Sequence, residues 1–273
     1  MPHLPQPFLD DLTALACRLA DAAGAAAMPH FRAPALVTDN KDADGFDPVT
    51  VADRAAEQAM RDILVAERPD DGIFGEEQER TFGTSGLTWV LDPIDGTRSF
   101  ISGLPLWGTL IGLDDGTEGR IGIIDQPHIG ERFVGVLGDG TRRAWVEHGG
   151  KTRELTTRGG VSLAQATFFT TDPALFQGVE MAAFETVHRQ ARLTRYGTDC
   201  YAYALLAMGQ IDLVIETGLA AYDIASHVPL IRAAGGVITD WEGDDCRWGG
   251  RVVAAGSKAL HEEVLEQIQA SLA

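Results

Sequence analysis

The stretch WVLDPIDGTRSF, residues 89–100, contains an apolar run that ends in two acidic residues. Asp92 follows the apolar run directly, and Asp95 comes three residues later. Two carboxylates this close repel each other, and one would be protonated unless a positive charge compensates them. A divalent cation such as Mg²⁺ supplies that charge and prefers oxygen ligands. The stretch therefore predicts a metal site at the end of a strand over residues 88–91.

The neighbours of Asp95 suit a phosphate group. Gly96 lets the backbone approach a ligand closely. Thr97 opens a predicted helical turn, whose free N–H groups can receive an oxyanion. The carbonyl of Ile94, between the two aspartates, is a further oxygen available to a metal. One short stretch thus offers both metal ligands and a phosphate-binding turn.

Composition excludes several classes of protein. With 45% hydrophobic and 23% charged residues, the 273-residue chain has the composition of a globular protein. The net charge of −18 argues against a nucleic-acid partner, whose phosphates would be repelled. Three widely spaced cysteines without metal-ligand spacing favour a reducing compartment. The chain shows neither a signal-peptide pattern nor an apolar stretch of membrane length, so we expect a cytoplasmic protein without a membrane partner.

Hydrophobic periodicity and turn residues predict the elements of the chain. Helices are expected over 8–28, 50–68, 173–187, 200–208, 223–234 and 258–272. Strands are expected over 72–77, 88–91, 104–113, 119–124, 131–137, 143–147, 161–172, 191–197, 210–215 and 235–241. This order predicts an α+β layer followed by an α/β layer. The boundary is expected near Gly149-Gly150, dividing the chain into two tightly packed parts, residues 1–148 and 149–273.

Two phosphatase chemistries use an aspartate pair followed by Gly-Thr. In haloacid-dehalogenase-like phosphatases the pattern is D-x-D-G-T, and the first aspartate is a covalent nucleophile. Here the two aspartates are one residue further apart, and Pro93 follows the first of them. That insertion would misplace the second carboxylate as a general acid. The motif also lies at residue 92 instead of near the start of its domain, and both departures argue against a covalent aspartyl mechanism.

The second chemistry fits motifs spread over residues 8–257. DPIDGT (92–97), GEE (75–77), FDPVTVADRAAE (46–57) and YDIASHVPLIRAAGGVITDWEG (222–243) together resemble the inositol monophosphatase superfamily. Tyr222 stands where the family commonly has tryptophan. The resemblance implies an αβαβα layered sandwich of the inositol monophosphatase and fructose-1,6-bisphosphatase type. It also implies a Mg²⁺-dependent phosphoric monoester hydrolase that acts on a small phosphorylated metabolite.

Other phrases resemble the histidinol-phosphate phosphatase branch of this superfamily. They are DPIDGTRSFISGLPLWGTLIGL (92–113), GIIDQPHIGERFVG (122–135) and RYGTDCYAYALLAMGQIDLVIE (195–216). Histidinol phosphate, in histidine biosynthesis, is therefore the first expected substrate. Thr198 and the loop before Asp223 depart from that branch, which keeps inositol-1-phosphate or another sugar or nucleotide phosphate as an alternative. A catalytically silent regulatory protein with this fold is a third alternative, disfavoured because all the expected site acids are present.

The resemblance also implies a set of site residues and a mechanism. Two or three Mg²⁺ ions per subunit would activate a water for direct attack on phosphorus. The implied metal ligands are Glu76, Asp92, the Ile94 carbonyl, Asp95 and Asp223, with a third, weaker ion near Glu76. Thr97 and Asp53 would orient and deprotonate the water, Glu76 would assist, and Gly96 and Thr97 N–H groups would bind phosphate. Lys41, in an Asp/Gly-rich loop, could close over the site. Members are often homodimers, so a homodimer is a further expectation.

Several of these residues also have a structural explanation. Asp53 fits a helix capping box with Thr50, and Asp223 fits a helix N-cap. On the substrate side, the resemblance places Asp199 and Glu216 near the non-phosphate end of the substrate, where two carboxylates would complement the amine and imidazole of histidinol phosphate. Arg195 is a further candidate substrate contact, with an exposed strand position as its alternative.

Overall fold

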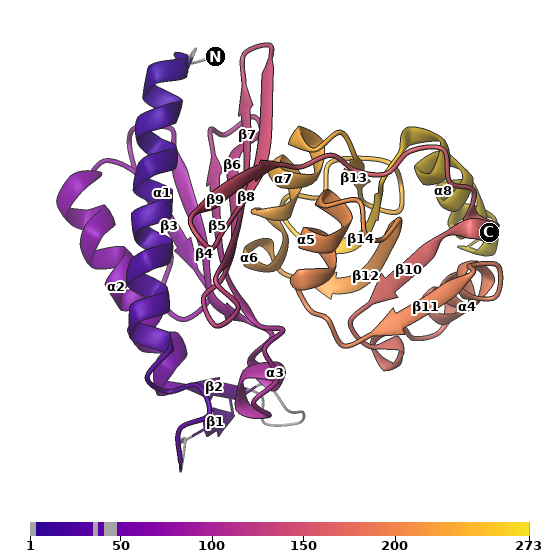
Figure 1. Cartoon of the computed structure of the whole chain (residues 1–273), viewed down its shortest axis with the longest axis horizontal. Coiled ribbons are helices and arrows are strands. Elements are labelled where there is room, and N and C mark those ends of the chain that lie inside the picture. Colours follow the sequence, from indigo (N-terminus) through magenta and orange to yellow (C-terminus); the bar gives the residue numbers. More distant parts are fainter. Residues whose placement is uncertain (1–3, 35–37, 41–47, 273) are drawn as a thin grey trace.

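Five layers of secondary structure stack in the computed structural model, which describes residues 4–34, 38–40 and 48–272. A seven-stranded and a five-stranded sheet alternate with three layers of helices (Figure 1). The outer helices are α1 (Gln6–Ala27) and α2 (Val51–Glu67) on one side and α4 (Val179–His188) and α8 (Lys258–Leu272) on the other. Between the sheets lie α5 (Tyr201–Ala207), α6 (Ala221–Ile224) and α7 (His227–Ala233). The expected αβαβα sandwich is confirmed.

The seven-stranded sheet follows chain order, and only its first two strands are parallel. Its strands are β3 (Gly72–Gly75), β4 (Thr88–Asp95), β5 (Gly108–Asp114), β6 (Gly119–Gln126), β7 (Glu131–Gly138), β8 (Thr141–His148) and β9 (Lys151–Glu154). Since β9 pairs with β8, this sheet extends past the expected division at residue 148. The division into two parts stays a proposal, and the sheets alone would place it after Glu154.

The five-stranded sheet is mixed and has the order β11-β10-β12-β14-β13. Its strands are β10 (Thr167–Thr170), β11 (Leu193–Tyr196), β12 (Leu213–Leu219), β13 (Val237–Thr239) and β14 (Gly250–Ala255). The remaining elements are a small sheet of β1 (Thr38–Asn40) and β2 (Pro48–Thr50), helix α3 (Thr97–Ile101), and two 3₁₀ turns at Leu163–Gln165 and Pro173–Leu175.

Helix α1 covers the outer face of the seven-stranded sheet. Its buried stripe contains Leu9, Leu12, Leu15 and Leu19, and alanines between them allow close contact with α2. Burial of such a stripe is the main source of stability for an amphipathic helix. None of the helices in the described ranges, α1 included, combines the length and apolar character needed to cross a membrane.

A row of glycines lets the inner helices rest directly on the seven-stranded sheet. Gly112, Gly122 and Gly135 are cross-strand partners on β5, β6 and β7. A Cβ atom on Gly122 would lie 1.8 Å from the Ser226 carbonyl oxygen, and one on Gly135 would lie 2.3 Å from the Leu230 Cα. Since only glycine avoids these collisions, the row fixes how closely α7, and α6 before it, approach the sheet.

Some sequence predictions of element bounds were wrong. Strand β4 continues to Asp95, beyond the predicted end at residue 91, because it pairs again with β5 after an irregularity. The predicted helix over 223–234 is two helices, broken at Ala225-Ser226. Strand β14 was not predicted, and the predicted strand over 104–113 begins only at Gly108.

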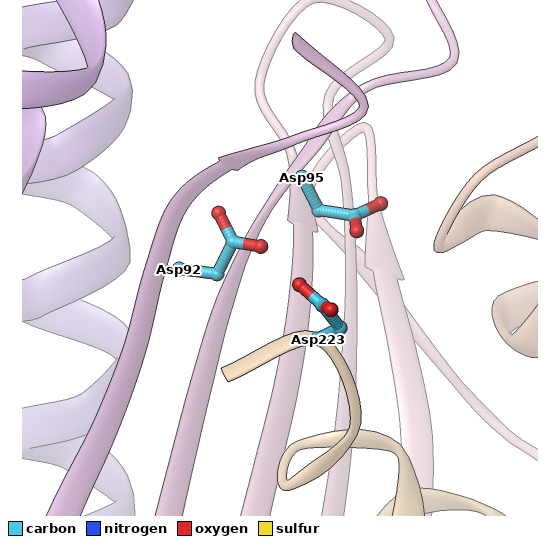
Figure 2. A group of neighbouring side chains, drawn as sticks. All are labelled: Asp92, Asp95 and Asp223. Carbon is cyan, nitrogen blue, oxygen red and sulfur yellow. The ribbon is translucent and has the colours of Figure 1, made fainter. Parts of the chain in front are cut away.

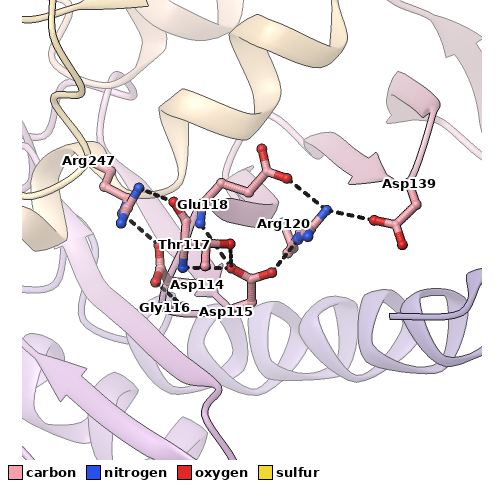
Figure 3. A network of polar contacts seen from close by, with 8 residues as sticks. All are labelled: Asp114, Asp115, Gly116, Thr117, Glu118, Arg120, Asp139 and Arg247. Carbon is pink, nitrogen blue, oxygen red and sulfur yellow. Dashed lines mark hydrogen bonds and ion pairs between the residues drawn. The ribbon is translucent and has the colours of Figure 1, made fainter. Parts of the chain in front are cut away.

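A polar network joins the C-terminal part of the chain to the β5–β6 turn (Figure 3). Arg247 forms an ion pair with Asp114 at 3.0 Å and donates to the Thr117 carbonyl at 2.6 Å. Next to it, buried Arg120 pairs with Asp115 at 2.7 Å. The contacts of Arg247 join the two sheets near Asp114, at the end of β5 away from Gly108, which pairs with Asp95.

Candidate active site

Three carboxylates meet between the two sheets. Asp92 and Asp95 come from β4, and Asp223 comes from α6; one oxygen from each lies within 4.8 Å of the others. Figure 2 shows the three side chains turned toward one another. Asp92 is buried, while the other two are partly exposed. The cluster therefore needs residues from both halves of the chain.

The irregularity in β4 explains how two aspartates three residues apart face one site. Asp92 pairs with Leu110 and Asp95 with Gly108, so β4 carries one residue more than β5 over this interval. In a regular strand, residues three apart point to opposite faces. The extra residue acts as a β-bulge and turns both carboxylates to the same side.

Electrostatics in the cluster favour a bound cation. Burial raises the pKa of Asp92 well above its usual range, and the neighbouring carboxylates of Glu76, Asp95 and Asp223 raise it further. The pKa of Asp95 is also raised, by burial first and then by Asp199 and Asp223. Burial and the mutual repulsion of these carboxylates therefore disfavour their charged forms. A divalent cation with a preference for carboxylate oxygens fits this set of groups.

Glu76 owes its position next to Asp92 to Glu57, a residue whose role the sequence did not reveal. The fully buried Glu57 carboxylate accepts the N–H groups of Glu77, at 2.7 Å, and Gln78, at 3.2 Å. A Cβ on Gly75 would lie 2.2 Å from this carboxylate, which explains the glycine before the two glutamates. The spacing in the sequence could have indicated this role, because Glu57 lies four residues, about one helical turn, after Asp53 and so lies on the same face of the helix.

Asp53 forms the expected helix cap and also lies near Thr97. Its Oδ2 accepts the Thr50 N–H at 2.8 Å and the Thr50 hydroxyl at 2.6 Å, which forms the expected capping box of α2. Its Oδ1 lies 3.4 Å from the Thr97 hydroxyl. That hydroxyl is also 3.1 Å from the Ile94 carbonyl oxygen, the predicted metal ligand. The cap holds Asp53 at the edge of the cluster, and α3 begins there at Thr97, after its N-cap Gly96 with φ of +80°.

A small acidic pocket adjoins the cluster. It has a volume of about 170 Å³ and is lined by residues that include Asp95, Asp199, Glu216 and Asp223. A larger cavity of about 680 Å³, between α1 and the β8–β9 hairpin, contains none of these acids. Its proximity to the cluster, and not its size, makes the smaller pocket the candidate site for the part of a substrate beyond its phosphate.

Asp199 and Glu216 accept hydrogen bonds from neutral groups in this pocket, and the positive charge of Arg98 also acts on Asp199. Asp199, with φ of +44°, accepts the Ser99 hydroxyl at 2.6 Å, and burial raises its pKa. Glu216 accepts the N–H of Thr171 at 2.7 Å and the hydroxyls of Thr171 and Thr170. Burial raises the pKa of Glu216 to about 7.

Arg195 is the predicted site residue that the structure does not bring to the pocket. It is exposed on β11. Lys41 lies outside the described residues. Asp223 is not the N-cap of its helix; it is inside the first turn of α6, and its carboxylate accepts the N–H of Ala220 at 2.7 Å.

The fold and this acidic centre define the class of metal-dependent phosphatases, and comparison with known proteins gives the family. The model of the inositol monophosphatase family matches residues 9–273, and the chain belongs to that family. It is a phosphoric monoester hydrolase that acts on small phosphorylated substrates.

Curated relatives include enzymes for both expected substrates. The Arabidopsis thaliana chloroplastic bifunctional phosphatase IMPL2 is 40% identical, over 98% of this chain and 78% of the relative. A Streptomyces coelicolor histidinol-phosphatase is 34% identical over 94% and 96%. A Rhizobium meliloti inositol-1-monophosphatase is also 34% identical, over 81% and 84%.

Solved structures share the fold. An inositol monophosphatase from Zymomonas mobilis has a TM-score of 0.81 and 44% identity, covering 95% of this chain and 98% of its own. The extragenic suppressor protein suhB of Bartonella henselae has a TM-score of 0.85 and 25% identity, with the same coverage.

Proposed function

We propose that the protein hydrolyses histidinol phosphate to histidinol and inorganic phosphate in a Mg²⁺-dependent reaction of histidine biosynthesis. The observation that carries this proposal is the acidic pocket beside the carboxylate cluster. Histidinol bears an amine and an imidazole, whereas an inositol ring carries no positive charge. Charge-assisted hydrogen bonds to carboxylates are among the stronger polar contacts, so two acids favour the cationic alcohol.

The size of the pocket agrees with a small leaving group. Its volume of about 170 Å³ is below the range of about 300–1,000 Å³ typical of sites for drug-sized ligands. A small amino alcohol therefore suits it better than a nucleoside. Relatives that act on inositol-1-phosphate keep that substrate as the second candidate.

In this proposal two groups of oxygen ligands would each hold one Mg²⁺ ion. Glu76, Asp92 and the Ile94 carbonyl would hold one ion, and Asp92, Asp95 and Asp223 would hold a second, with Asp92 shared; a third ion near Glu76 completes the proposed set. When bound, such ions lower the pKa of a water molecule and offset negative charge on the phosphate and the leaving oxygen. Asp92 is the residue on which both sets depend.

The remaining groups position the reactants. The Thr97 hydroxyl, close to Asp53, would orient the attacking water, and Asp53 would receive its proton through that hydroxyl. The N–H groups of Gly96 and Thr97, at the start of α3, would hold phosphate oxygens. Asp199 and Glu216 would bind the amine and imidazole. Water attacks phosphorus directly, and no residue forms a covalent bond to phosphate.

Phosphate release in the presence of Mg²⁺ tests the substrate. The panel contains histidinol phosphate, inositol-1-phosphate, fructose-1,6-bisphosphate and 3′-phosphoadenosine 5′-phosphate. We expect the highest kcat/KM for histidinol phosphate. A clear preference for any other member would overturn the proposal for the substrate and leave the phosphatase class intact.

A further inference from the structure

Tyr203 on α5 lines the pocket that also contains Glu216 and His227. The residue is only 3% exposed, and its buried hydroxyl has no hydrogen-bond partner among the residues that the structure describes. The nearby Tyr201 differs, because its hydroxyl donates to Glu131 at 2.5 Å. Buried hydroxyl groups almost always have a partner. The exception at Tyr203 therefore marks a group that a ligand can satisfy.

The surroundings of Tyr203 define the chemistry of that ligand. Its ring lies against the His227 imidazole, with centroids 4.2 Å apart. His227 Nδ1 is hydrogen-bonded to Ser226, and burial lowers the pKa of His227 to about 3, so the imidazole is neutral. An uncharged ring pair thus forms one wall of the pocket, and Glu216 supplies a carboxylate in the same pocket.

We propose that Tyr203 is a specificity-determining residue whose hydroxyl hydrogen-bonds a nitrogen of the leaving alcohol. A phenol hydroxyl both donates and accepts, so it can pair with an ammonium N–H or with either nitrogen of an imidazole. The matching substrate is a small phosphate monoester whose alcohol part carries a nitrogen base. This inference rests on the proposed function and adds a recognition residue to it.

The test compares Tyr203→Phe with wild-type enzyme on two substrates in Mg²⁺. The variant keeps the ring and removes only the hydroxyl that lacks a partner, so a melting curve should show a fold as stable as the wild type. We expect kcat/KM for histidinol phosphate to fall about 10- to 100-fold, in keeping with one lost hydrogen bond to a charged or polar group. The fall for p-nitrophenyl phosphate, which carries no nitrogen base, should be at least about fivefold smaller.

Tyr196→Phe is the matched control, since Tyr196 is an exposed tyrosine on β11 that does not line the pocket. It should leave both kcat/KM values at the wild-type level. Equal losses on both substrates in Tyr203→Phe, or no loss on either, would overturn the inference. A wild-type preference for inositol-1-phosphate would instead overturn the proposed function. In that case, if Tyr203→Phe left the ratio of kcat/KM for inositol-1-phosphate to kcat/KM for p-nitrophenyl phosphate unchanged, Tyr203 would not be a specificity-determining residue either.

Discussion

The backbone N–H of Cys200 donates to the carboxylate of Asp95 at 2.7 Å, although the two residues are 105 positions apart in the chain. This bond ties the start of α5 to the irregular end of β4. Ser99, which donates to Asp199, makes a second tie across the same gap. The acidic centre is therefore assembled only when the two sheets and the helices between them are in place.

Asp53→Asn should separate catalysis from helix capping. The asparagine oxygen can still accept the Thr50 N–H, so the free energy of unfolding should change little. Proton acceptance through Thr97 is lost, and kcat should fall about 10²- to 10⁴-fold. Thr50→Ala is the comparison, with a stability loss of about 1 kcal/mol and a smaller effect on kcat. Phosphate release measures kcat and urea unfolding measures stability in both variants. Turnover at the wild-type level in Asp53→Asn would show that Asp53 does not take part in the reaction.

Glu216 should make stability depend on pH. Its pKa is raised from 4.5 to about 7 by burial, so the folded protein binds more protons than the unfolded chain between these values. The contribution of Glu216 to the unfolding free energy is therefore fully present below pH 4.5 and is lost as pH rises through 7, by up to about 3 kcal/mol.

Glu216→Gln should abolish this part of the pH dependence. Urea unfolding at pH 5 and pH 8 measures it, with Glu266→Gln, an exposed glutamate on α8, as the control. The decrease in unfolding free energy from pH 5 to pH 8 should be smaller in Glu216→Gln than in the wild type or the control. An equal drop in all three proteins would show that Glu216 is not held in an environment that disfavours its charge.

Asp199→Asn should weaken recognition of a cationic substrate. Asparagine tolerates a positive φ and can still accept the Ser99 hydroxyl, so mainly the charge changes. Hydrogen bonds to charged groups are worth about 1.5–3 kcal/mol, so kcat/KM for histidinol phosphate should fall roughly 10- to 150-fold. The same assay with p-nitrophenyl phosphate should show a smaller loss, and equal losses would exclude Asp199 from substrate recognition.

Gly122→Ala should disturb the site from a distance. The new methyl group would meet the backbone of Ser226, three residues after Asp223, and such overpacking costs about 1–3 kcal/mol. We expect a lower melting temperature and weaker activation by Mg²⁺. Gly159→Ala is the control, because a Cβ there meets nothing within 4 Å. Equal melting temperatures in the two variants would show that the close approach does not constrain the fold.

The order of helices and strands and the aspartate pair were predictable from local patterns, whereas the layered sandwich and the full set of acids were implied by the resemblance to the family. Asp92, Asp95 and Asp223 each stand beside an apolar run, and the capping box at Thr50 and Asp53 is a four-residue signal. The bulge in β4 was not predictable, because it depends on pairing with β5. The break between α6 and α7 has the same kind of cause, since its position is set where Ser226 meets Gly122.

Side-chain roles that depend on burial were also hidden. In the sequence, Glu57 looks like one more polar residue on the exposed face of a helix. The structure shows instead that its buried carboxylate binds the N–H groups of the loop after β3. Tyr203 reads as a core residue of α5, and only the lack of a hydroxyl partner distinguishes it from Tyr201. Arg195 was predicted as a substrate contact, but its proximity to Asp199 in the sequence does not bring it into the pocket.

The central claim is that Asp92 joins both metal sites, and a Mg²⁺ titration of the Asp92→Asn variant tests it most directly. Phosphate release and melting temperature are followed as Mg²⁺ is added, with Asp11→Asn, an exposed aspartate on α1, as the control. Ligand binding at 100 times its dissociation constant stabilises a protein by about 2.7 kcal/mol. We predict that wild type and Asp11→Asn gain stability and activity with Mg²⁺, while Asp92→Asn folds but gains neither. Mg²⁺-dependent turnover and stabilisation at wild-type levels in Asp92→Asn would contradict the account.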